Sequence, residues 1–156
     1  MVSRPAGLKA ALDTPTGPFW IEARAGAIVA AGWGPVLRPA RGVDLLQRAC
    51  VQVTAYWAGL LQDFDLPLDP GGTGLAARVW AEMRAIPYGR TRSYGEIGAA
   101  LGVPPQAVGQ ACGANPLPLL IPCHRVTGTG RLGGFSGALG PETKAALLRH
   151  EGALLI

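Results

Sequence analysis

The chain has few of the residues that build metal sites or disulfide frameworks. Its 156 residues include three cysteines, Cys50, Cys112 and Cys123, and two histidines, His124 and His150. No two cysteines form a spaced pair, so the sequence indicates neither a disulfide framework nor a structural zinc site. We therefore expect no metal and no cofactor.

The sequence also lacks long apolar segments and any internal repeat or low-complexity tract. Its apolar runs are shorter than the length that spans a bilayer. Its first residues lack the apolar core of a signal peptide. These absences predict a cytoplasmic protein that does not associate with membranes.

Acidic residues are sparse in the second half of the chain. Residues 1–69 contain six basic and six acidic side chains, whereas residues 70–156 contain eight basic side chains and four acidic ones. The whole net charge of +4 therefore lies in the second half. This excess favours a polyanionic partner such as nucleic acid, whose binding weakens with salt. The alternative is an ordinary solvated basic surface.

The first half predicts a small sheet and a helix. Apolar and β-branched residues occupy 19–24 and 27–33 on either side of Ala25-Gly26, a pattern that is typical of a β-hairpin. A helix is expected from Asp44 to about Leu61. Cys50 lies in this stretch and is predicted to be a core residue.

A domain boundary is predicted in a segment rich in proline and glycine, 66–73. The charge balance changes at the same place. We expect an α/β (α+β) fold with two domains: an N-terminal scaffold, 1–69, that holds a β-hairpin or sheet plus a helix, and a mainly helical DNA-binding domain, 70–156, with a helix-turn-helix.

Three helices are predicted after the boundary. Apolar residues at helical spacing cover 75–85. Ser93 and Glu96 have the spacing of a capping box, which predicts a short helix that ends before Gly102. Pro104-Pro105 then begins a helix over 106–113. Two short helices joined by a tight turn are typical of a helix-turn-helix.

The last of these helices is unusually slim. Its small residues are Ala107, Gly109, Ala111, Gly113 and Ala114. A recognition helix in the major groove normally presents long polar side chains, and this one offers only Gln106 and Gln110. A slim helix suits the minor groove, from which a damaged base can be extruded. The alternative is that the small residues serve tight helix packing. Cys112, in the same helix, is predicted to be a packing residue.

The pentapeptide Pro122-Cys123-His124-Arg125-Val126 follows an apolar run and precedes a glycine-rich loop, which indicates a displayed nucleophile. A thiol reacts as thiolate, which a neighbouring base or cation favours. His124 supplies the base and Arg125 the positive charge.

Neighbours in an extended segment point to opposite faces, so a bridging water is the expected proton path between Cys123 and His124. Glu151 is the candidate acceptor that orients the imidazole. The alternative is a buried thiol beside a structural histidine.

With these residues assembled, the chain resembles the O6-alkylguanine-DNA alkyltransferases, or methylated-DNA–protein-cysteine methyltransferases. The resemblance covers about residues 72–152, in the order of the family's motifs. The matching blocks are Gly72-Thr73, Val79-Trp80, Ile86-Pro87-Tyr88-Gly89, Ser93-Tyr94-Gly95-Glu96-Ile97, Ala107-Val108-Gly109, Asn115-Pro116-Leu117-Pro118, Ile121 to Val126, Ser136-Gly137 and His150-Glu151-Gly152.

This resemblance implies a one-shot DNA repair reaction. The protein would flip an O6-alkylated guanine out of duplex DNA, and Cys123 would take the alkyl group irreversibly. Whether O4-alkylthymine is also a substrate is left open by the sequence. Glu151 would orient His124, and His124 would act through water as the base. Asn115 would shape the turn that holds them, and Tyr94 would assist departure of the guanine.

The resemblance also implies binding residues. The Val126 carbonyl and Ser136 would hold the base, Pro118 would wall the alkyl pocket, and Phe135 stands where the family often has tyrosine. The expected DNA-binding residues are Gln106, Ala107, Gly109, Gln110 and Arg92. The partner would be double-stranded DNA that contains O6-alkylguanine, bound through its minor groove by a monomer.

The chain departs from the family at Gln106, where arginine is common. Gln106 can hydrogen-bond a base or phosphate but carries no charge, so Arg90 or Arg92 would have to substitute for the cation. This departure leaves a second reading open, that of a lesion-binding protein that flips the base without accepting the alkyl group. A cysteine hydrolase and a helix-turn-helix transcription regulator are the remaining alternatives.

Overall fold

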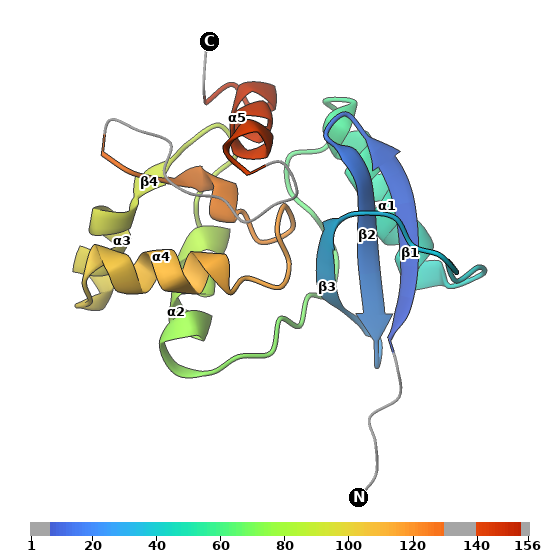
Figure 1. Cartoon of the computed structure of the whole chain (residues 1–156), viewed down its shortest axis with the longest axis horizontal. Helices are drawn as coiled ribbons and strands as arrows, with labels where there is room; N and C mark the ends of the chain where they lie inside the picture. Colours follow the sequence, from blue (N-terminus) through green and yellow to red (C-terminus); the bar gives the residue numbers. More distant parts are fainter. Residues whose placement is uncertain (1–6, 130–139, 154–156) are drawn as a thin grey trace, which may run out of the picture. The chain divides into compact units, whose positions relative to one another are not determined.

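The structure is a computed structural model that describes residues 7–129 and 140–153. Two compact units are present, Met1–Pro70 and Gly71–Ile156. Strands and one helix build the first unit and mainly helices the second, as Figure 1 shows for each unit. The predicted mixed α+β fold is confirmed. No helix within the described ranges is both long and apolar enough to cross a membrane.

The first unit is a three-stranded antiparallel sheet with one helix. Its elements are β1 (Leu8–Thr14), β2 (Gly17–Arg24), β3 (Ala27–Trp33) and α1 (Asp44–Trp57), and the strand order is β1-β2-β3. Alternate residues of β2, Phe19 and Ile21, are fully buried. The apolar stripe of α1 is also buried, at Leu46, Ala49, Val53 and Tyr56. These two surfaces form the core of this unit.

The predicted hairpin is confirmed, because β2 and β3 pair across Ala25-Gly26. Both turn residues have positive φ, 52° and 79°, as a two-residue turn that matches strand twist requires. The first strand, β1, is an addition that the sequence pattern did not predict. The helix begins at Asp44 as expected and ends at Trp57 rather than near Leu61.

The second unit is mainly helical. Its elements are α2 (Gly74–Arg84), β4 (Arg92–Ser93), α3 (Tyr94–Leu101), α4 (Pro105–Gly113), the 3₁₀ turn η1 (Cys123–Arg125), β5 (Val126–Thr127) and α5 (Pro141–His150). The predicted positions of α2, α3 and α4 are confirmed to within a residue or two. The assignment of α3 and α4 as a DNA-binding helix-turn-helix stays a prediction.

The start of α3 is fixed by the predicted capping box, which the structure confirms. The Glu96 backbone N–H donates to Ser93 Oγ at 3.0 Å, and the Ser93 N–H donates to Glu96 Oε1 at 3.4 Å. Gly102 ends the helix with a φ of 72°. Each bond satisfies a backbone donor that a helix start leaves unpaired. Tyr94, the first residue of α3, is thereby held in place.

The slim helix α4 is anchored to α2 by a buried side chain. Trp80 Nε1 donates to the Ala111 carbonyl at 2.8 Å, and Trp80 is 5% exposed. Val108 and Ala111 face the interior, while Gln106 and Gln110 lie on the exposed side. The small residues of α4 therefore contribute to two surfaces. The inner surface packs against the rest of this unit, and the outer surface is exposed and has few long side chains.

Two glycines of α3 predict opposite stability effects. A Cβ at Gly98 would lie 2.5 Å from the Val103 carbonyl oxygen, whereas a Cβ at Gly95 would meet nothing closer than Ser93 Oγ at 3.8 Å. We expect Gly98→Ala to lower the free energy of unfolding by about 1–3 kcal/mol, as overpacking does. The matched control Gly95→Ala should raise it by up to about 1 kcal/mol, because alanine restricts the unfolded chain. Urea denaturation measures both, and equal effects would contradict the close packing at Gly98.

Candidate active site

The reactive thiol is placed by a pinned loop and a short 3₁₀ turn. Asn115 Nδ2 donates to the Ile121 carbonyl at 2.9 Å, and the Leu117 N–H donates to Asn115 Oδ1 at 2.9 Å. The loop interior is apolar, with Leu117 and Ile121 fully buried. One amide side chain therefore fixes both ends of the segment that leads into Cys123, the first residue of η1.

The segment after the turn brings Tyr94 to the same place. Strand β5 pairs in parallel with β4, with Arg92 opposite Val126 and Ser93 opposite Thr127. Because Tyr94 directly follows Ser93, it lies at the edge of this small sheet. Lys144 Nζ joins the two segments, donating to the Val126 carbonyl at 2.6 Å and to Tyr94 Oη at 3.4 Å.

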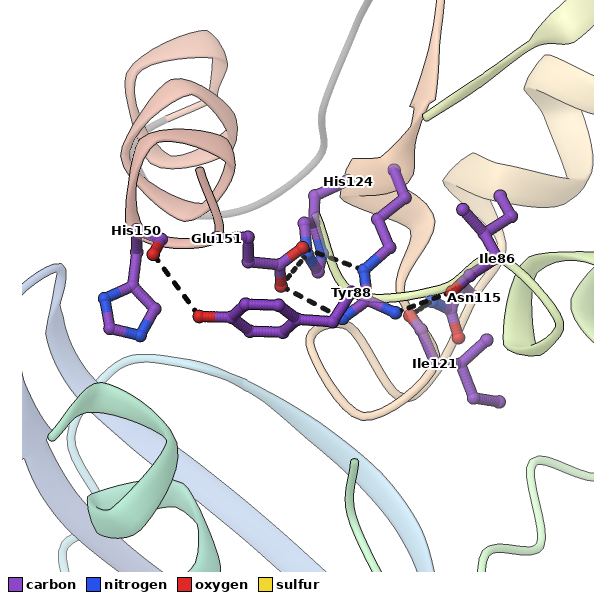
Figure 2. A network of polar contacts seen from close by, with 8 residues as sticks. Ile86, Tyr88, Asn115, Ile121, His124, His150 and Glu151 are labelled. Carbon is purple, nitrogen blue, oxygen red and sulfur yellow. Dashed lines mark hydrogen bonds and ion pairs between the residues drawn. The ribbon is translucent and has the colours of Figure 1, made fainter. Parts of the chain in front are cut away.

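A buried hydrogen bond connects His124 with Glu151. His124 Nε2 lies 2.8 Å from Glu151 Oε2, and both side chains are fully buried (Figure 2). Burial alone would raise the pKa of Glu151, but hydrogen bonds and charges from His124 and Arg125 lower it to about 2. An ionised carboxylate only accepts hydrogen bonds, so Nε2 carries the imidazole proton. The lone pair of a neutral His124 is then on Nδ1.

The other imidazole nitrogen has no direct partner in the described part of the chain. His124 Nδ1 is buried and makes no hydrogen bond there, to Cys123 or to any other group. Burial lowers the pKa of His124, which favours the neutral imidazole. A neutral imidazole with a lone pair on Nδ1 can accept a proton. The chain turns at η1, yet His124 Nδ1 makes no hydrogen bond to the Cys123 thiol. The water-mediated path between them stays a prediction.

Arg125 contacts Glu151 rather than the thiol. Its Nε donates to Glu151 Oε1 at 2.8 Å, its Nη2 to Oε2 at 3.1 Å and its Nη1 to the Ile86 carbonyl at 2.8 Å. The sequence interpretation that Arg125 supplies the positive charge beside Cys123 is therefore wrong. The guanidinium is engaged with the carboxylate, which is its closest match in geometry and charge.

The cation that influences the thiol is Lys144. Burial raises the pKa of Cys123, and the Asn115 side chain and the Lys144 charge act in the opposite direction. Lys144 is fully buried, and burial lowers its pKa to about 8 although Cys123 and Cys112 raise it. At neutral pH the ammonium is therefore still largely protonated and favours the thiolate.

Sequence reasoning missed Lys144, although one signal was present. Lys144 and Glu151 are seven residues apart, and Leu147 and Leu148 lie between them at helical spacing. That spacing puts Lys144 on the buried stripe of α5 and Glu151 on the same side at the C-cap of the helix, where it is also buried. A charged residue at a buried position needs partners, and the partners found here are those of the site.

Known proteins share both the sequence and the fold. The family model described as "6-O-methylguanine DNA methyltransferase, DNA binding domain" matches residues 75–153. A "DNA base-flipping protein" of Thermus thermophilus is 47% identical over 92% of this chain and 99% of its own length. A "Methylated-DNA--protein-cysteine methyltransferase" of Mycolicibacterium paratuberculosis is 40% identical over 84% of this chain and 89% of its own.

The chain belongs to the 6-O-methylguanine DNA methyltransferase family. Two solved structures agree. The Mycobacterium tuberculosis O6-methylguanine methyltransferase matches with a TM-score of 0.82 and 35% identity, over 95% of this chain and 94% of that one. The M. tuberculosis protein OGT in complex with DNA matches with a TM-score of 0.82 and 38% identity, over 92% of each chain.

Within this methyltransferase fold, the residues predicted to bind DNA lie mostly on α4. Gln106 and Gln110 are exposed, one helical turn apart, and Ala107 and Gly109 are half-buried. Arg92 lies elsewhere, on β4, and its Nη1 is 2.7 Å from Glu82 Oε2. Because that ion pair already engages its charge, Arg92 is a weak substitute for the arginine common in the family, and Arg90 is exposed.

The remaining predicted residues are only partly described. Pro118 is half-buried in the loop before Cys123 and pairs with Ile121. Ser136 and Phe135 lie outside the described residues. Across 7–129 and 140–153, no cluster of three or more histidine, cysteine or acidic side chains is placed to hold a metal. All three cysteines are free thiols.

Proposed function

We propose that this member of the methyltransferase family repairs DNA by moving the alkyl group of O6-alkylguanine onto Cys123. The observation that carries this proposal is the convergence on η1 of the Cys123 thiol, the His124–Glu151 pair and the Lys144 ammonium. Those are the parts that nucleophilic displacement at carbon needs: a thiol, a base and a cation to stabilise the thiolate.

The proposed reaction is a single displacement. The thiol proton passes, through water, to Nδ1 of His124. The sulfur then forms a bond to the alkyl carbon while the bond from that carbon to guanine O6 breaks. The leaving guanine is protonated, and the Tyr94 hydroxyl is positioned beside Lys144 to assist. The product is guanine in DNA and a thioether on Cys123. A thioether has no good leaving group, so each molecule reacts once.

Duplex DNA is the proposed partner, entered from the minor groove. The exposed side of α4 carries two uncharged amides and otherwise small residues, a surface too short to read the wide major groove. The narrow minor groove admits such a helix and lets the damaged base leave the stack. The M. tuberculosis protein that matches this chain was solved in complex with DNA.

The direct experiment measures repaired guanine in the DNA. A duplex with one O6-methylguanine is mixed with equimolar protein, and the nucleosides are then quantified by chromatography. We expect wild type and the control Cys112→Ala to restore guanine, and Cys123→Ala to restore none. If wild type binds the lesion tightly but restores no guanine, the lesion-binding alternative is favoured instead. The observation behind this alternative is the similarity to the T. thermophilus "DNA base-flipping protein".

Adding a charge at Gln106 should strengthen DNA binding. We expect Gln106→Arg to tighten binding to undamaged duplex and to steepen the dependence of log affinity on log salt by about 1, as one added phosphate contact does. Gln47→Arg, which adds the same charge on the exposed side of α1, is the matched control. Fluorescence anisotropy at several salt concentrations measures both. Equal slopes for the two variants would show that Gln106 is not at the DNA interface.

We further propose that the protein acts as a monomer in the cytoplasm. One thiol and one flipped base complete the chemistry, so no second subunit is needed. A thiol nucleophile is preserved in a reducing compartment, and all three cysteines are free. Light scattering after gel filtration tests the first statement, and cell fractionation tests the second.

A further inference from the structure

Arg125 is buried beside the reactive thiol, although burial of a charged side chain is costly unless the charge is paired. It is 6% exposed, too little for a contact with DNA phosphates. Three of its five N–H groups donate to named acceptors, two to Glu151 and one to the Ile86 carbonyl. Its guanidinium carbon also lies 5.7 Å from the centre of the Tyr88 ring. A guanidinium held by three hydrogen bonds from three different nitrogens has one defined position.

Glu151 Oε2 is shared between two donors. It accepts from His124 Nε2 at 2.8 Å and from Arg125 Nη2 at 3.1 Å, while Oε1 accepts from Arg125 Nε at 2.8 Å. The single negative charge of the carboxylate is thus already balanced by the guanidinium. A second proton on His124 would place an uncompensated positive charge among fully buried side chains, which is costly.

We propose that Arg125 is a positioning residue for the transfer reaction: by balancing the charge of Glu151 it keeps His124 neutral, with its proton on Nε2 and its lone pair on Nδ1. This inference rests on the proposed function. Without Arg125, the carboxylate would attract a second proton to His124, and the imidazolium could not accept the thiol proton. A histidine beside an unbalanced carboxylate has a raised pKa.

Other titratable groups also lie around His124. Cys123 precedes it on η1, and Lys144 faces the site from α5 and donates to the Val126 carbonyl and Tyr94. Cys112 lies on α4, and Tyr88 lies between α2 and β4 with its Oη donating to the His150 carbonyl at 3.3 Å. Of these groups, Lys144 is a cation, whereas Arg125 is the cation that makes two hydrogen bonds to the Glu151 carboxylate. Burial lowers the pKa of His124, Glu151 raises it, and Arg125 and Lys144 lower it.

The experiment compares Arg125→Met, Arg125→Lys and a matched control, Arg84→Met, which removes an exposed arginine at the end of α2. The rate of methyl transfer from duplex O6-methylguanine is measured from about pH 5 to about pH 9, where a general base titrates. In parallel, peptide mass spectrometry follows alkylation of Cys123 by iodoacetamide without DNA.

We expect the acid limb of both profiles to move up by about 1–3 pH units in Arg125→Met, the range over which one close charge shifts a pKa. Arg125→Lys keeps the charge but not the two-pronged contact, so its acid limb should stay near that of wild type while its rate falls. Arg84→Met should match wild type.

An unmoved acid limb in folded Arg125→Met would overturn the inference and leave the proposed function intact. Failure of wild type to transfer methyl would overturn the proposed function, and the iodoacetamide profile would still test the inference.

If the Arg125 variants do not fold, the protonation state of His124 in wild type tests the role given to Arg125. ¹⁵N NMR of the labelled imidazoles, assigned with His150→Gln, reports which ring nitrogen carries a proton. We expect His124 to be the neutral Nε2–H tautomer at neutral pH. An imidazolium, or a proton on Nδ1, would overturn the role given to Arg125.

Discussion

Glu151→Gln is expected to lower both the rate of alkyl transfer and the stability of the second unit. The amide cannot balance the buried guanidinium of Arg125, and breaking a buried pair by removing one partner costs about 3–5 kcal/mol. Its NH₂ group can also donate to His124 Nε2, which would move the imidazole proton to Nδ1. Loss of the base should then slow transfer by about 10²–10⁴-fold. Single-turnover kinetics and urea denaturation measure the two effects.

The same substitution should change how stability depends on pH. The folded-state pKa of Glu151 is about 2, below its ordinary 4.5, so its contribution is present above pH 4.5 and is lost as pH falls towards 2. Wild type should therefore lose stability in that window, and Glu151→Gln should lack this component. Glu142→Gln, an exposed change in the first turn of α5, is the control and should behave like wild type. Identical pH profiles for all three proteins would contradict the buried ion pair.

Lys144→Met should remove the cation that favours the thiolate while keeping the length of the side chain. We expect transfer to slow by about 10²–10³-fold, the size of effect seen when one electrostatic contact to a developing charge is lost. The variant also leaves the Val126 carbonyl without the donor at 2.6 Å. Lys9→Met, at the chain's other lysine, lies in the first unit and should transfer at the wild-type rate.

The stability of wild type and Lys144→Met should differ in a pH-dependent way. The pKa of Lys144 in the fold is about 8, below its ordinary 10.5, so between these values the unfolded chain binds the extra proton. Stability then rises with pH. Wild type should therefore gain stability relative to the variant from about pH 8 to about 10.5. A constant difference across that range would mean that Lys144 is not desolvated as the structure places it.

Local rules were sufficient for much of the fold. Ser93 and Glu96 predict the start of α3, and Gly102 predicts its end, because the bonds that fix them span only a few residues. The strand β1 was missed because Leu8–Thr14 has no β-branched residue before Thr14, contains two alanines, one lysine and one aspartate, and is exposed or half-buried throughout, so its sequence gives little strand signal. Its pairing with β2 depends on tertiary context.

The site was predicted in part, and the missing part depends on contacts that are distant in sequence. The pairing of His124 with Glu151 follows from the need of an imidazole for an orienting acceptor, and the structure places the two 2.8 Å apart. The partner of Arg125 could not be derived, because its adjacency to Cys123 in sequence suggested the wrong target. The catalytic and binding roles of the named residues stay predictions.

The decisive measurement is peptide mass spectrometry after the addition of one equivalent of duplex DNA with a single O6-methylguanine. We expect the Cys123 peptide to gain the mass of one methyl group in place of hydrogen, to a stoichiometry of one per protein, while the Cys50 and Cys112 peptides stay unmodified. Repair of the guanine with no change at Cys123, or methylation spread over all three cysteines, would contradict transfer to the Cys123 thiol.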